Sequence, residues 1–114
     1  MDIPPQVQDK LAQFQTLQQQ LQLLGLQKQQ LLVQGNDVDN ALTELGKISG
    51  GEKVYRAVGM LLIESSKGES EKMLKEEKEL GDTRIKVLER QEKKLTERFE
   101  ELRKELQAML GKGE

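Results

Sequence analysis

The chain has 114 residues, enough for one domain, and 18 basic against 20 acidic residues leave a formal charge of −2. Apolar residues make up 35% and aromatic residues 3%, so a broad compact core is hard to build and an elongated protein fits better. The chain contains neither cysteine nor histidine, which removes disulfides, the usual nitrogen and sulfur metal ligands and most catalytic chemistry. We therefore expect no enzymatic activity and no cofactor.

The small acidic net charge argues against nucleic acid as a partner. Because no basic region followed by an apolar run opens the chain, we expect a cytoplasmic protein without a membrane partner.

The first segment predicts one long helix over residues 4–45. Twelve of the 14 glutamines lie here, and apolar residues recur with the alternating three- and four-residue spacing of a coiled-coil seam. Pro4 and Pro5 stand where a first helical turn tolerates proline, and Gly46 can end the helix in a left-handed conformation. The predicted seam residues are Val7, Lys10, Phe14, Leu17, Leu21, Leu24, Lys28, Leu31, Gly35, Val38, Leu42 and Leu45.

Residues 46–68 predict linkers and a β-hairpin. Residues 53–57 and 60–64 are short, rich in strand-forming residues and separated by Val58-Gly59, a turn signal. An isolated two-stranded hairpin is marginally stable and has two open edges, so we expect its strands to pair with those of other subunits. The residues expected to mediate this oligomerisation are Val54, Tyr55, Val58, Met60, Leu62 and Ile63.

A second helix is predicted over residues 69–110. Its seam residues are Leu74, Lys78, Gly81, Ile85, Leu88, Glu92, Leu95, Phe99, Leu102, Leu106 and Met109. Each predicted helix is roughly 63 Å long, and their equal seams favour an antiparallel hairpin. Aligning Leu45 with Leu74 makes Lys28 and Glu92 a polar pair that fixes the register, with Phe14 facing Leu106 and Gly35 facing Ile85.

Two weak motifs do not change this interpretation. Asp37-Val38-Asp39-Asn40 has the start of a calcium loop, but Leu42 and Ile48 replace its required glycine and glutamate. The outer glycines of residues 46–51 have the spacing of a phosphate loop, but Glu52 and Lys53 stand where lysine and serine or threonine are needed. We expect neither a metal nor a nucleotide site.

Several stretches together resemble the beta-type subunits of archaeal prefoldin. They are residues 4–8 (PPQVQ), 17–22 (LQQQLQ), 27–29 (QKQ), 53–56 (KVYR) with Val58-Gly59, and 88–95 (LERQEKKL). The resemblance implies a single prefoldin-like domain over residues 1–114, whose hairpin joins an inter-subunit β-barrel. It also implies an ATP-independent holdase built from two alpha-type and four beta-type subunits. Such a hexamer captures non-native polypeptides between its coiled-coil tips and delivers them to a group II chaperonin.

We expect the substrate-binding tips at the helix ends furthest from the hairpin. Apolar residues meet there that a two-helix seam cannot cover completely: Ile3, Val7, Leu11, Phe14, Leu106, Met109 and Leu110. Terminal fraying without function is an alternative explanation of the same residues. The alternative for the whole protein is a coiled-coil scaffold or tether that has no chaperone activity.

Overall fold

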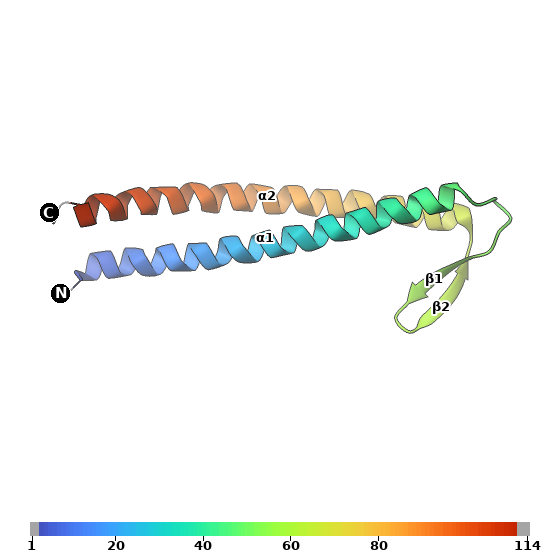
Figure 1. The fold of residues 1–114 in the computed structure, drawn as a ribbon, viewed down its shortest axis with the longest axis horizontal. Coiled ribbons are helices and arrows are strands. Elements are labelled where there is room, and N and C mark those ends of the chain that lie inside the picture. Colours follow the sequence, from blue (N-terminus) through green and yellow to red (C-terminus); the bar gives the residue numbers. More distant parts are fainter. Residues whose placement is uncertain (1–2, 112–114) are drawn as a thin grey trace. The chain divides into compact units, whose positions relative to one another are not determined.

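The computed structural model describes residues 3–111, which form two long helices with a β-hairpin between them in chain order (Figure 1). The elements are α1 (Pro5–Gly46), β1 (Val54–Val58), β2 (Leu61–Ser65) and α2 (Lys67–Gly111). The predicted coiled-coil hairpin with a central β-hairpin is therefore confirmed. Within the described range, no helix is long and apolar enough to cross a membrane.

The chain divides into two compact units, each with antiparallel segments of α1 and α2. The terminal unit contains the segments up to Gln29 and from Lys86 onward. The hairpin unit contains residues 30–85, with both strands and the helix ends that adjoin them. In the two units together, all twelve predicted seam residues of α1 and all eleven of α2 are buried or half-buried. The heptad spacing therefore predicted the buried stripe of each helix correctly.

Both ends of α1 differ slightly from the prediction. The helix begins at Pro5, and the carbonyl of Pro4 accepts the first helical hydrogen bond, from Gln8 N at 3.0 Å. Pro5 occupies the first helical position, where its missing N–H costs no hydrogen bond. At the other end, Gly46 does not adopt the predicted left-handed conformation, since among the described residues only Gly59 has a positive φ. The chain leaves the helix through tighter bonds such as Lys47 N to Glu44 O.

Helix α2 begins at Lys67, two residues earlier than predicted, because Ser66 caps it. The Ser66 hydroxyl accepts a hydrogen bond from Glu69 N at 3.1 Å, and the Ser66 carbonyl accepts one from Ser70 N. Serine followed three residues later by glutamate is a capping-box signature that the prediction overlooked. A further bond, from Lys67 Nζ to the Ile48 carbonyl at 2.9 Å, ties the start of α2 to the segment that directly follows α1.

The β-hairpin is confirmed, but its turn lies one residue later than predicted. Val58 pairs with Leu61, so the two turn residues are Gly59 and Met60 and not Val58 and Gly59. Gly59 has a φ of 59°, whereas Met60 has no positive φ. This is the type II′ arrangement, in which only the first central residue needs the left-handed region and glycine supplies it.

Candidate functional site

The hairpin carries the most exposed apolar side chains of the hairpin unit. Leu61 and Leu62 are 67% and 73% exposed, and Met60 at the turn is completely open to solvent. Of the six residues predicted to mediate oligomerisation, five are exposed and only Val54 is half-buried. Leu61 is as open as these but was missing from the predicted set.

Apolar residues lie on both faces of this ribbon. Cross-strand partners share a face, so Val58, Leu61 and Ile63 lie on one face and Leu62 lies on the other with Ala57. In the described part of the chain, β1 pairs only with β2, which leaves the outer backbone edge of each strand free. A ribbon with two open edges and two apolar faces is suited to pairing with further strands.

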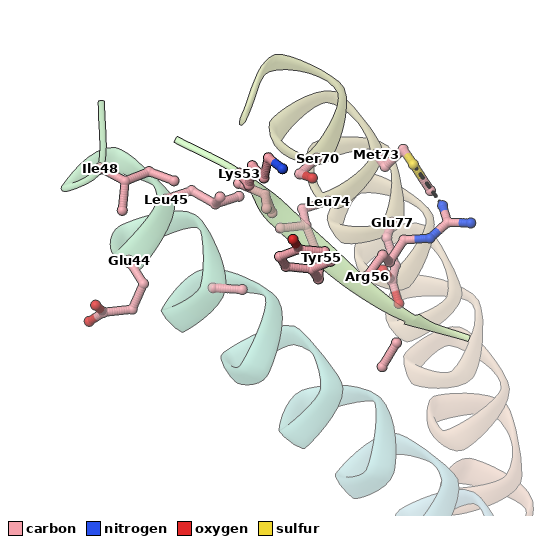
Figure 2. Close-up of a pocket in the computed structure, with 13 residues that line it drawn as sticks. Glu44, Leu45, Ile48, Lys53, Tyr55, Arg56, Ser70, Met73, Leu74 and Glu77 are labelled. Atoms are coloured by element: carbon pink, nitrogen blue, oxygen red, sulfur yellow. Dashed lines mark hydrogen bonds between the residues drawn. The ribbon is translucent and has the colours of Figure 1, made fainter. Parts of the chain in front are cut away.

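A hollow of about 700 Å³ lies between β1 and the two helices of the hairpin unit. Figure 2 shows the Tyr55 ring beside Leu74 of α2, and Leu45 of α1 also lines the hollow. On the α2 side, the Arg56 guanidinium donates to the Met73 sulfur at 2.8 Å (Figure 2). The first strand is therefore attached to α2, whereas no residue of the second strand lines the hollow.

The terminal unit brings Lys28 and Glu92 together. Lys28 Nζ lies 3.7 Å from Glu92 Oε1, and both side chains are half-buried in the seam. This geometry fits a polar pair between the helices. Its effect on the register stays a prediction.

At the chain ends, the structure separates the seven predicted tip residues by exposure. Ile3 and Leu110 are 45% and 59% exposed. Leu11, Phe14 and Met109 are half-buried. Val7 and Leu106 are buried, as their predicted positions in the seam require.

Two contacts near these ends were not predicted and bind the helices to each other. The Phe14 ring stacks on Phe99, with centroids 4.3 Å apart, whereas the seam alignment paired Phe14 with Leu106. Lys10 pairs with Glu105, and its hydrogen bond holds the pKa of that carboxyl below its ordinary value, with a smaller opposing effect of burial. The sequence contains the partners, but their spacing alone does not show which residues meet.

In the hairpin unit, Gly35 contacts a different neighbour from the one expected. A Cβ on Gly35 would lie 3.1 Å from Lys78 Nζ, and Ile85 is not within 4 Å of that position. The same ammonium pairs with Asp39 at 3.0 Å and with Asp82 at 4.0 Å. The missing side chain therefore makes room for a lysine that crosses between the helices.

Comparison with known proteins gives consistent matches over nearly the whole chain. The prefoldin subunit family matches residues 8–113. A prefoldin subunit beta from Archaeoglobus fulgidus is 46% identical over 109 residues, covering 96% of this chain and 94% of that protein. One from Methanosarcina acetivorans is 42% identical over 110 residues, again covering 96% and 94%. The crystal structure of the prefoldin beta subunit from Thermococcus strain KS-1 superimposes with a TM-score of 0.85 at 40% identity, covering 96% of each chain. The chain therefore belongs to the prefoldin family, with its archaeal beta subunits as close relatives.

Proposed function

We propose that the chain is a subunit of an ATP-independent holdase that grips non-native polypeptides at its helix ends and delivers them to a group II chaperonin. Family membership makes it part of a non-enzymatic chaperone that includes alpha-type subunits. The proposal extends this to a cytoplasmic hexamer of two alpha-type and four beta-type subunits. The observation that carries it is the apolar surface left open at the end of the terminal unit, on Ile3 and Leu110.

Two features of this end support the proposed client binding: buried contacts hold the helices together, and apolar side chains beside them stay exposed. Val7 and Leu106 are buried and keep the helices together, as do the Phe14–Phe99 stack and the Lys10–Glu105 pair. Apolar side chains can therefore stay exposed at the end of a helix pair without the pair coming apart. Each such surface is small, so affinity would come from several subunits holding one client, because linked sites raise effective concentration.

Assembly is proposed to occur through the hairpins, as strands of an inter-subunit β-barrel. The open strand edges and the exposed Leu61 and Leu62 support this role, since pairing would satisfy the edges and cover the leucines. The Tyr55 and Arg56 contacts of β1 with the helices would hold the ribbon in place while β2 remains available.

The client grip is tested with Ile3→Ser/Leu110→Ser in the complex formed with an alpha-type subunit. The matched control is Val87→Ser on α2, an apolar residue of similar exposure away from the chain ends. We expect the double variant to lose most protection of an aggregating unfolded protein while the control protects normally, with no effect of added ATP. Full protection by the double variant would overturn the proposed grip. A wild-type complex that gives no protection would favour the scaffold function.

The assembly role is tested with Leu62→Asp, compared with the apolar control Leu62→Met. We expect native mass measurement of mixtures with the alpha-type subunit to show hexamers for the control and smaller species for Leu62→Asp. Helical circular dichroism should change little, since Leu62 is not part of either helix. An unchanged mass for Leu62→Asp would contradict the β-barrel.

A further inference from the structure

The outer face of α1 in the terminal unit carries two exposed leucines that the helix pair does not use. Leu23 and Leu26 are 57% and 64% exposed, and neither belongs to the seam. At about 100° per residue they lie about 60° apart on the helix surface, with Leu26 about 160° and Leu23 about 100° from Leu24, which is a seam residue. Exposed leucines three residues apart form a small apolar patch, which we name the outer leucine patch.

The surroundings of this patch carry almost no charge. Between residues 11 and 29 the sequence contains eight glutamines and one charged residue, Lys28, which is paired with Glu92 in the seam. Gln19, Gln22 and Gln27 lie three or four residues from one or both leucines, so they border the patch on the helix surface, and all three are exposed. By contrast, the outer face of α2 carries many acidic and basic side chains.

This combination is complementary to an extended, non-native polypeptide. Such a chain exposes apolar side chains together with backbone N–H and C=O groups that have no partner. A glutamine amide both donates and accepts, so it can bond to either backbone group. Because the border is neutral, an apolar segment can bind there without desolvating charged groups.

We propose that the outer leucine patch, with its glutamine border, is a second client-contact surface, which holds extended non-native segments along α1. The inference rests on the proposed holdase function and adds a site apart from the helix ends. A second copy of the chain is a poorer occupant, because two leucines bury far less than the roughly 800 Å² per partner of a standard stable interface. A weak contact repeated on several subunits suits a transiently held chain.

The test measures binding of reduced and carboxymethylated α-lactalbumin, a permanently unfolded chain, to the complex formed with an alpha-type subunit. Leu23→Gln/Leu26→Gln removes the patch and retains good helix formers. Leu80→Gln/Val87→Gln is the matched control, with two exposed apolar residues replaced on α2. We expect about tenfold weaker binding for the patch variant, equivalent to ~1.4 kcal/mol, and unchanged binding for the control. Equal affinities for the two variants would overturn the proposal.

A second measurement keeps both leucines and locates the client directly. A photo-crosslinking amino acid at position 22 should capture the labelled unfolded chain, whereas the same group at position 90 on α2 should not. Crosslinks only to another subunit would assign the patch to assembly and overturn the inference. In the same binding assay, Ile3→Ser/Leu110→Ser reports separately on the helix ends. Loss for that variant with none for the patch variant would refute this inference alone, whereas absence of binding by the wild-type complex would refute the proposed function as well.

Discussion

Three glycines inside the helices predict different responses to alanine, because the space around them differs. A Cβ at Gly25 or Gly81 meets no atom within 4 Å, so each alanine should add the full difference in helix propensity, about 1 kcal/mol of stability. A Cβ at Gly35 meets Lys78 Nζ at 3.1 Å and must displace it. Displacement weakens the pairs with Asp39 and Asp82, each worth at most about 1 kcal/mol at a surface. We therefore expect a net change near zero for Gly35→Ala.

The three variants are compared by guanidinium unfolding followed by circular dichroism, at one protein concentration because assembly adds stability by mass action. The decisive control is Gly35→Ala in a Lys78→Met background, where no ammonium or ion pair remains to be disturbed. There the substitution should stabilise by about 1 kcal/mol, like the other two. If Gly35→Ala stabilises equally with and without Lys78, the reasoning from the lysine contact is refuted. A loss of stability for Gly81→Ala would contradict the conclusion that there is open space for a Cβ at this position.

Three further outcomes follow from the same helix pair. Lys28→Leu and Glu92→Leu should each destabilise the fold by roughly 1 kcal/mol or more, because a single change leaves one unpaired charge in the seam. The double variant should recover stability. A double variant less stable than both single variants in denaturant unfolding would contradict this. Since Lys10 lowers the pKa of Glu105, the pair stabilises the folded chain above the ordinary pKa of 4.5, and this contribution is lost as the pH falls below that value. Glu105→Gln should therefore make the stability of the fold fall less steeply at acidic pH. An unchanged acid dependence would exclude the pair as its cause. Ser66→Ala should cost about 1 kcal/mol through loss of the α2 cap, measured against Ser49→Ala in the preceding linker, and equal losses would argue against capping.

The helices could be predicted from the sequence because heptad spacing is a local signal. Every predicted seam position, including the polar Lys10 and Lys28, is buried or half-buried. The errors concern the ends of elements, where a single side chain or backbone angle sets the boundary. The hairpin turn moved by one residue because Gly59 supplies the positive φ at the first turn position, and α2 began early because Ser66 and Glu69 form a cap.

Contacts between the helices were harder to predict than the seam itself. A seam alignment assumes one constant offset along both helices, but Phe14 stacks on Phe99, about two helical turns from the residue that this offset selects. Long side chains add a second uncertainty, since Lys78 reaches Asp39 across the space beside Gly35. For the candidate site, the sequence identified the apolar residues of the hairpin and chain ends. Heptad spacing placed Val7 and Leu106 in the buried seam, but it could not show that Ile3 and Leu110 are open while Leu11 is half-buried.

The exposed hairpin also has a consequence for the balance of subunit synthesis. A copy that has found no partner displays Leu61, Leu62 and two free strand edges, the features by which incompletely folded proteins are held or aggregate. Because the same strands are proposed to close the assembly, a surplus copy resembles a client until it is incorporated. The features that mark an unassembled subunit are therefore those of a client, and subunits made in excess of their partners should occupy the assembled chaperone in place of other clients.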